Sequence, residues 1–214
     1  MSSVAEAWHR VRDDVATYGR GRAEVVAVTK SQPAPIVLEV VRSGCLRIGE
    51  NYARELADKR AVLPADVEVH FIGRLQTNKV RLVAPMVSLW QTVDRPSLVD
   101  EIARRAPGAD VLIQVGLTTD PGKGGCGESD LDELLERSRS AGLSVRGLMT
   151  VGPTSADIVE TRRVFAETRR LAETRGLREL SMGMSADWRI GIDEGSTLVR
   201  IGTAIFGERP PTAR

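Results

Sequence analysis

Lysine is scarce in this sequence. Only four of the 30 basic residues are lysines, and the others are arginines. The four are Lys30, Lys59, Lys79 and Lys123. A lysine amine gives up its proton far more readily than a guanidinium and can then act as a nucleophile. Each lysine is therefore a candidate for a task that arginine cannot perform.

Cysteine, net charge and long apolar runs are equally limited. The two cysteines, Cys45 and Cys126, lie in no CxxC or Cys/His cluster, which argues against a disulfide framework or a zinc site and fits a reducing compartment. A net charge of +1 gives no electrostatic reason to expect nucleic acid or a membrane surface as a partner. No run approaches a membrane span, and the charged N-terminus lacks the apolar core of a signal peptide. We expect a cytoplasmic protein.

Short β-rich runs alternate with amphipathic helical patterns along the chain. The opening helix is marked by an apolar stripe of Val4, Trp8, Val11 and Val15. The expected strands cover residues 23–29, 45–49, 67–72, 86–93, 110–116, 145–149, 178–182 and 197–201. The expected helices between them lie near 34–43, 51–61, 77–83, 96–106, 129–141, 156–175 and 186–194.

Eight strands separated by helices predict an α/β protein with a parallel sheet. The natural closure of eight such units is a single (β/α)₈ TIM barrel, and a doubly wound open sheet is the alternative. We expect one domain over residues 1–214, with an extra N-terminal helix in residues 1–20 packed on the barrel. Residues 208–214 are expected to be a frayed tail.

The active site of a TIM barrel lies at the carboxyl ends of its strands. The first strand, "AEVVAVT", delivers Lys30 to that end, the second delivers Glu50 and Asn51, and the third carries His70 near its end. Lys30 either marks the point where an apolar strand leaves the core, or its amine is the working group of the protein.

The last two strands end in patterns suited to an anion. In "MGMSAD", Ser185 occupies an expected helix N-cap, where its hydroxyl and the first free N–H groups of the helix would face a ligand. In "RIGTAIFG", Gly202 allows close approach of the backbone and Thr203 adds a hydroxyl. A plain helix cap and an ordinary rim turn are the alternatives. Their occurrence together on adjacent strand ends favours a phosphate site.

A lysine facing a phosphate site indicates a carbonyl ligand that carries a phosphate, held as a Schiff base. Pyridoxal phosphate and phosphorylated sugars both fit this description. Arg200 lies two residues before Gly202, on the same face of the strand, and its guanidinium is suited to donate to a pyridine nitrogen. The alternative for Arg200 is an ion pair inside the barrel, with Glu50 as the partner.

Six motifs together resemble the family of pyridoxal phosphate homeostasis proteins. They are "AVTK", "IGENYARE", "HFIGRLQTNK", "RGLMT", "SMGMSADW" and "GSTLVRIGTAIFG", and they follow the order and spacing of that family from about residue 4 to 209. Members of the family are small proteins with a fold similar to the barrel domain of bacterial alanine racemase.

The resemblance implies pyridoxal 5′-phosphate as the cofactor, held by Lys30 as a covalent internal aldimine. It implies that Arg200 faces the pyridine nitrogen and that Asn51 lies near the cofactor. The residues that match the phosphate-binding positions are Ser185, Gly202 and Thr203. It leaves open whether a second, looser site lies near Lys79 or Lys123. It gives no role to His70 or to the glycine-rich loop at 118–129.

The same residues argue against catalysis. A guanidinium at the pyridine nitrogen keeps the ring unprotonated, which weakens it as an electron sink. Racemization also needs an acid or base on each face of the cofactor, and neither Tyr18 nor Tyr52 is well placed as the second. We expect a monomeric carrier or buffer of pyridoxal phosphate, with apo-enzymes that depend on this cofactor as candidate recipients. The alternatives are a weak amino-acid racemase and, less favoured, a Schiff-base aldolase acting on a sugar phosphate.

Overall fold

Eight parallel strands close into a barrel. The structure, a computed structural model, describes residues 3–118, 120, 122–155 and 157–208. The strands follow one another around the barrel in chain order, and β8 pairs with β1 to close it. They are β1 (Glu24–Val28), β2 (Arg47–Glu50), β3 (Glu68–Phe71), β4 (Leu89–Val93), β5 (Asp110–Gln114), β6 (Ser144–Met149), β7 (Glu179–Met184) and β8 (Leu198–Ile201). The predicted TIM barrel is confirmed, and the open sheet is excluded.

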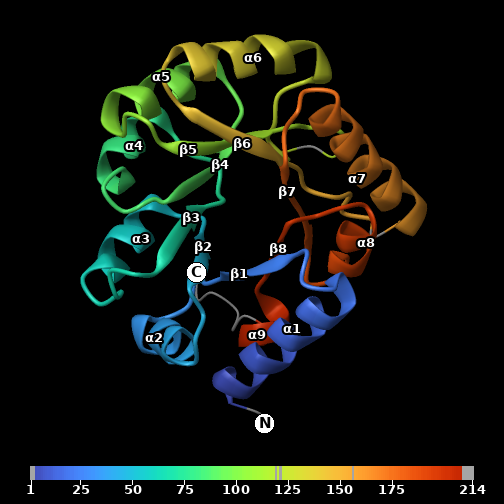
Figure 1. The fold of residues 1–214 in the computed structure, drawn as a ribbon. Helices are drawn as coiled ribbons and strands as arrows, with labels where there is room; N and C mark the ends of the chain where they lie inside the picture. The colour runs from blue at the N-terminus through green and yellow to red at the C-terminus, as the bar shows by residue number, and fades with distance from the viewer. Residues whose placement is uncertain (1–2, 119, 121, 156, 209–214) are drawn as a thin grey trace.

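A ring of helices surrounds the barrel, which Figure 1 views along its axis from the N-terminal ends of the strands. The helices are α1 (Val4–Gly19), α2 (Ala34–Arg42), α3 (Ala53–Arg60), α4 (Thr77–Val83), α5 (Pro96–Arg105), α6 (Glu128–Ser140), α7 (Ile158–Glu173), α8 (Trp188–Asp193) and α9 (Thr203–Phe206). All but α9 lie close to the ranges predicted from the sequence, and α9 is an additional short helix that follows β8.

The extra helix α1 packs across α2, α8 and α9, next to the seam between β1 and β8. A capping box starts it: Ser3 Oγ accepts the Glu6 N–H, and Glu6 Oε2 accepts the Ser3 N–H. Its buried stripe contains Trp8, Val11 and Val15, as the sequence predicts. The predicted N-terminal helix is therefore part of the packed structure.

The main core lies between the strands and the surrounding helices, and a smaller apolar cluster lies apart from it. The smaller cluster consists of Val26, Leu89, Leu112, Met149 and Leu198, from five different strands. Both free cysteines belong to the main core, where burial raises the pKa of each thiol to about 11.

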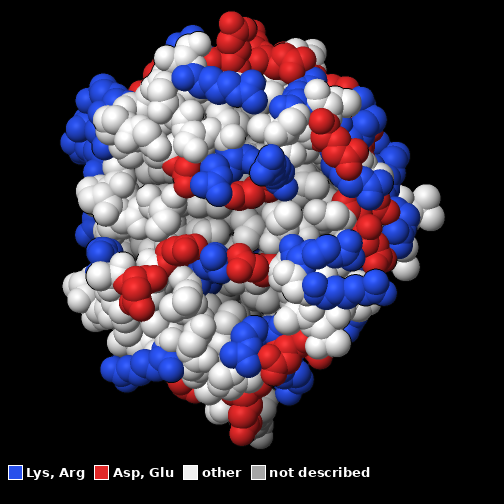
Figure 2. Space-filling model, in the orientation of Figure 1, with Lys and Arg blue, Asp and Glu red and all other residues white. Residues whose placement is uncertain are grey.

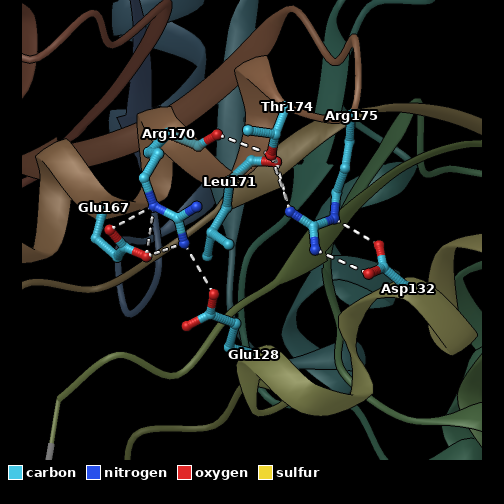
Figure 3. Close-up of polar contacts among 7 residues, drawn as sticks. All are labelled: Glu128, Asp132, Glu167, Arg170, Leu171, Thr174 and Arg175. Atoms are coloured by element: carbon cyan, nitrogen blue, oxygen red, sulfur yellow. Dashed lines mark hydrogen bonds and ion pairs between the residues drawn. The ribbon is translucent and has the colours of Figure 1, made fainter.

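Ion pairs tie neighbouring helices together on the outside of the barrel. Figure 3 shows Arg170 of α7 between Glu167 on its own helix and Glu128 of α6, while Arg175 forms two hydrogen bonds to Asp132. Exposed pairs of this kind each contribute about 0–1 kcal/mol. They keep α6 and α7 in register and lie away from the strand ends that matter for function.

Charged side chains also cover the lower mouth of the barrel, at the N-terminal ends of the strands. Figure 2 shows acidic and basic side chains interspersed across this face. Two arginines each form ion pairs with carboxylates on the strands to either side of their own. Arg47 pairs with Glu24 and Glu68, and Arg146 pairs with Asp110 and Glu179. These pairs surround a polar cavity of about 470 Å³ and largely neutralise its charge.

The connection from β2 to α3 is longer than predicted, because the expected helix at 51–61 begins later. This connection lies at the upper mouth of the barrel, where the strands have their carboxyl ends. Asn51 and Tyr52 stay outside the helix, which begins at Ala53. A Cβ at Gly73 would lie 2.1 Å from the Asn51 carbonyl oxygen, so only glycine allows the two backbones to pass so closely. This crossing holds Asn51 at the end of the strand.

Among the residues described, no helix is both long and apolar enough to cross a membrane. The same residues contain no group of three or more His, Cys, Asp or Glu side chains arranged for a metal ion. Residues 209–214 of the expected tail lie outside the described residues, as do residues 119 and 121 of the glycine-rich loop.

Candidate functional site

A cavity of about 640 Å³ opens at the carboxyl ends of the strands. Its wall contains all six residues that the sequence identifies as candidates: Lys30, Asn51, Ser185, Arg200, Gly202 and Thr203. These residues come from the ends of β1, β2, β7 and β8 and are separated by up to 173 positions in the sequence. The structure therefore brings the predicted site together.

Lys30 sits in a turn that begins directly after β1. It is half-buried in the cavity wall, between Thr29, which is fully buried, and Ser31, which is exposed. Ser31 adopts a left-handed backbone with φ of +62°, which is unusual for a serine. A conformation of this kind persists only where surrounding contacts impose it.

Those contacts come from a buried network around Lys59. Lys59 Nζ lies 2.6 Å from both Glu50 Oε1 and Glu55 Oε1, and it donates to the Thr29 carbonyl at 2.7 Å. Glu50 Oε1 also accepts the Thr29 hydroxyl, and Glu55 Oε1 accepts the Ser31 N–H, both at 2.6 Å. The peptide groups on both sides of Lys30 are therefore held by one ion cluster.

Two members of the ion cluster are shielded from water, while the Glu55 side chain is 23% exposed. Glu50 is fully buried and Lys59 is 4% exposed. Burial raises the pKa of Glu50, and the Lys59 ammonium opposes that rise. Removing either partner would leave an uncompensated charge in the interior, which typically costs about 3–5 kcal/mol.

Ser185 and Gly202 meet between the last two strands. Ser185 Oγ accepts the Gly202 N–H at 3.3 Å, so the two loops are joined directly. The expectation that Ser185 is a helix N-cap is wrong: the chain makes a further turn, and Asp187 precedes α8. A Cβ at Gly202 would lie 3.3 Å from Val28 Cβ, which explains the glycine at this close crossing.

Arg200 projects into the same cavity from β8, although only 4% of the residue is exposed. Its Nη1 donates to the carbonyl and hydroxyl oxygens of Ser181, both at 2.7 Å, and its Nη2 donates to the Thr150 carbonyl at 2.8 Å. The suggested ion pair with Glu50 is wrong, because that carboxylate is bound to Lys59. Within the described part of the chain, no carboxylate forms an ion pair with Arg200.

The charge of Arg200 persists despite its burial. Loss of hydration lowers the pKa of the guanidinium to about 10, and the more distant Asp187 carboxylate opposes that change. Arg200 is thus protonated at neutral pH. Three of its five N–H donors have protein acceptors, so two are left for a ligand.

His70 is not part of this cavity. Its ring lies in the wall of the lower cavity, so the expectation that β3 delivers it to the reactive end of the barrel is wrong. Its Nδ1 lies 2.8 Å from Gln91 Nε2. Burial lowers the pKa of His70 to about 4, which keeps the ring neutral at pH 7.

The two other lysines of interest differ in position. Lys123 lies in the cavity wall, where its ammonium donates to Asp120 at 2.6 Å and to the Gly152 carbonyl. Lys79 is exposed and lines a separate depression, which shares Asn51 with the main cavity. Asn51 Oδ1 is buried and has no hydrogen-bond partner among the described residues.

Sequence reasoning missed the residues that support the site. Glu55 and Lys59 stand four positions apart on one helix, and that spacing is the signal that identifies the pair. Ser181, Thr150 and Gln91 carry no such signal. Their polar atoms meet only because the barrel places distant strands opposite one another.

A family model confirms the predicted similarity to the barrel domain of alanine racemase. The model named "Alanine racemase, N-terminal domain" matches residues 3–210. Alanine racemase from Corynebacterium glutamicum has a TM-score of 0.77 at 16% identity, with 99% of this chain and 62% of that chain covered. At this identity the likeness concerns the fold. Fold and site together define a barrel of the alanine racemase N-terminal domain type.

Curated relatives narrow the class. The pyridoxal phosphate homeostasis protein of Aquifex aeolicus is 38% identical over 98% of this chain and 96% of its own. The protein of the same name from Escherichia coli K12 is 36% identical, with 98% of each chain covered. PipY from Synechococcus elongatus, solved with and without PLP, has a TM-score of 0.86 at 31–32% identity and covers 95% of this chain and 100% of its own. The chain belongs to the family of pyridoxal phosphate homeostasis proteins.

We expect acid to destabilise the protein through His70. The unfolded chain takes up this proton near pH 6.5 and the folded protein only near pH 4, so the stabilisation is complete above pH 6.5 and is lost as the pH falls toward 4. From pH 7 to pH 4.5 the free energy of unfolding should fall by about 2–3 kcal/mol more in wild type than in His70→Asn. Urea unfolding at both pH values measures this difference.

The matched control is His9→Asn, because His9 is exposed on α1. This variant should keep the pH dependence of the wild type. An unchanged pH dependence in His70→Asn would contradict the assignment of a neutral, buried imidazole.

Proposed function

We propose that this protein binds pyridoxal 5′-phosphate in the cavity at the carboxyl ends of the strands, called the upper cavity below. We further propose that it acts as a carrier that limits the concentration of free cofactor. The observation that carries the proposal is Arg200, a charged and almost fully buried group that has no ion-pair partner among the described residues and has donors left over. Its place with Lys30 in the wall of one cavity, on the neighbouring strand, gives the proposal its chemistry.

A buried cation is normally paired, because loss of hydration is compensated only by an opposite charge or strong hydrogen bonds. Arg200 has three neutral acceptors instead. Such a group is prepared for a ligand that carries acceptors or negative charge. Pyridoxal phosphate offers both, in its ring nitrogen, its phenolic oxygen and its phosphate.

Five of the six candidate residues have a place in this assignment. Lys30 would hold the aldehyde carbon covalently, and Arg200 would donate to the ring nitrogen. The phosphate would lie against Ser185, Gly202 and Thr203, which line the same cavity. When bound, pyridoxal phosphate supplies an electrophilic aldehyde and an electron-withdrawing ring. The chain supplies the amine, the hydrogen-bond donors and the close backbone crossing of Gly202 with Val28.

The relatives support the same ligand. PipY, which is 31% identical, has been solved with PLP bound, and the curated relatives bear the name pyridoxal phosphate homeostasis protein. The cavity that holds the six candidate residues has ample volume for a ligand of this size. The likeness to these relatives points to pyridoxal phosphate, and the buried charge of Arg200 fits a ligand of that chemistry.

We further propose that the bound cofactor is kept and not used for catalysis. A permanently protonated Arg200 leaves the ring nitrogen unprotonated, which weakens the ring as an electron sink. Neither tyrosine lines the upper cavity: the Tyr18 hydroxyl donates to Asp193 at 2.9 Å, and Tyr52 lines the separate depression. The second amine in the described cavity wall, on Lys123, is bound to Asp120 and the Gly152 carbonyl, so we assign it no role as the second acid or base of a racemase.

Lys30 should be the residue that binds the aldehyde. Wild type titrated with pyridoxal phosphate should develop the absorption band of a Schiff base, and borohydride should fix the cofactor on Lys30. Lys30→Ala should lose the band, because the other amine in the cavity wall, on Lys123, is held by Asp120 and the Gly152 carbonyl. The absorption titration and peptide mapping measure this.

Lys79→Ala is the matched control for that titration, because it removes an exposed amine near the cavity but outside it. It should keep the wild-type band. A wild type that takes up no pyridoxal phosphate would refute the proposal. Borohydride trapping of a sugar phosphate but not of pyridoxal phosphate would favour an aldolase instead.

Arg200→Ala should weaken binding without preventing it. A hydrogen bond from a charged group contributes about 1.5–3 kcal/mol, so the dissociation constant should rise about 10- to 100-fold while the band still forms at high concentration. Absorption titration measures the constant, and thermal unfolding checks the fold. A variant that binds as tightly as wild type would show that the guanidinium does not touch the cofactor.

The loaded protein should not racemize alanine or serine at a rate above that of free pyridoxal phosphate. The reasons are an unprotonated ring, the absence of both tyrosines from the cavity wall and the binding of the Lys123 amine to Asp120 and Gly152. Circular dichroism of each amino acid incubated with loaded wild type measures the rate. Turnover that disappears in Lys30→Ala would replace the carrier by a racemase.

A further inference from the structure

A chain of buried polar side chains runs across the inside of the barrel from Arg200. Arg200 Nη1 lies 2.7 Å from Ser181 Oγ, Ser181 Oγ lies 2.7 Å from Gln91 Oε1, and Gln91 Nε2 lies 2.8 Å from His70 Nδ1. The members come from β8, β7, β4 and β3 in turn. The chain thus begins in the wall of the upper cavity and ends in the wall of the lower one.

The middle of this chain is closed to water. Gln91 and Ser181 are fully buried, and His70 is 3% exposed. Ser181 and Gln91 lie 90 positions apart on strands that are not neighbours, so their hydrogen bond passes through the interior of the barrel. No water competes for these groups, and each must satisfy the next.

Arg200 determines the direction of every bond in the chain. A guanidinium can only donate, so Ser181 Oγ must accept from it and is left to donate to an oxygen. That oxygen is Oε1 of Gln91, which turns the amide nitrogen toward His70. His70 Nδ1 must then accept, and its proton belongs on Nε2, which lies 3.8 Å from Glu68 Oε2 at the lower mouth.

Only one arrangement of protons satisfies all four groups. If the Gln91 amide were reversed, its nitrogen would face Ser181 Oγ, and the hydroxyl would lose its acceptor. If His70 carried its proton on Nδ1, that proton would face the Gln91 amide nitrogen. Either change would leave a buried donor unsatisfied, which costs about 1–3 kcal/mol. The arrangement is therefore cooperative.

We propose that Ser181, Gln91 and His70 are positioning residues for Arg200, which hold its guanidinium plane toward the cofactor through this one-directional chain. Ser181 contacts Arg200 directly, whereas Gln91 and His70 act through it. The chain compensates a charge that no carboxylate in the described structure pairs with. It also fixes which two N–H groups of Arg200 face the cavity.

The first test needs no cofactor, so its outcome is independent of the proposed function. The chain has two histidines, and His9→Asn identifies the signals of His70 in protein labelled with ¹⁵N-histidine. NMR of wild type should show His70 as the Nε2–H tautomer alone. Ser181→Ala should introduce the Nδ1–H tautomer, although Ser181 does not touch His70, because the Gln91 amide is then free to reverse.

Arg200→Ala should have the same effect from a greater distance. An unchanged His70 tautomer in both variants would overturn the proposal, since a merely structural contact does not transmit the direction of a hydrogen bond. Ser181→Thr, which keeps the hydroxyl, should retain the wild-type tautomer. Loss of the Nε2–H tautomer of His70 in a folded Ser181→Thr variant would also contradict the proposed hydrogen-bonded chain.

The second test rests on the proposed binding of pyridoxal phosphate. Ser181→Ala and Gln91→Leu should each raise the dissociation constant about 5- to 20-fold and alter the absorption of the bound cofactor. The dissociation constant of the double variant should be at most about twice that of the single variant that binds less tightly, because both residues act through one path. Fully additive effects would overturn the proposal.

Ser138→Ala is the control for loss of a buried hydroxyl, because Ser138 donates to the Leu134 carbonyl within α6, away from the cavity. It should bind pyridoxal phosphate like wild type. Wild-type affinity in Ser181→Ala and Gln91→Leu would refute their positioning role. A wild type that binds no pyridoxal phosphate would refute the proposed function. The tautomer measurement would then be the only test of the hydrogen-bonded chain from Arg200 to His70.

Discussion

The buried contact between Lys59 and Glu50 supports the backbone around Lys30 at the upper mouth of the barrel, where the strands have their carboxyl ends. It connects α3 with the end of β2, and through the Thr29 carbonyl it reaches the end of β1. With Glu55 it also imposes the left-handed turn at Ser31. A lysine side chain is long and flexible, and it can present its amine in a defined direction only if its backbone is fixed. The ion cluster supplies that rigidity without entering the cavity.

The barrel and the candidate site follow from simple rules of sequence. Alternating strand and helix patterns dictate a parallel sheet, and the carboxyl ends of parallel strands always meet on one side. For that reason residues as distant as Lys30 and Gly202 are predictable neighbours. The glycine also has a local cause, since the backbone at Gly202 passes close to Val28.

The partners of the polar side chains were beyond that reasoning. Strand parity predicts which face a residue lies on, but the register shifts between Ser181 and Met184 and between Trp90 and Val93, so the count of residues loses its meaning there. His70 lines the lower cavity although it stands next to the last residue of its strand. Ser185 binds a neighbouring loop and caps no helix. Such contacts depend on packing across the barrel, which no local pattern encodes.

The lysine contacts also affect how readily the protein's own side chains would react with an aldehyde. A protein that holds a reactive aldehyde is exposed to it, and surface amines would compete for the ligand and be modified. Here Lys59 is enclosed by carboxylates, and Lys123 is bound to Asp120 and Gly152. Both thiols are buried and protonated, and arginine provides almost all of the remaining basic charge. The composition thus leaves few nucleophiles to divert the aldehyde from the cavity.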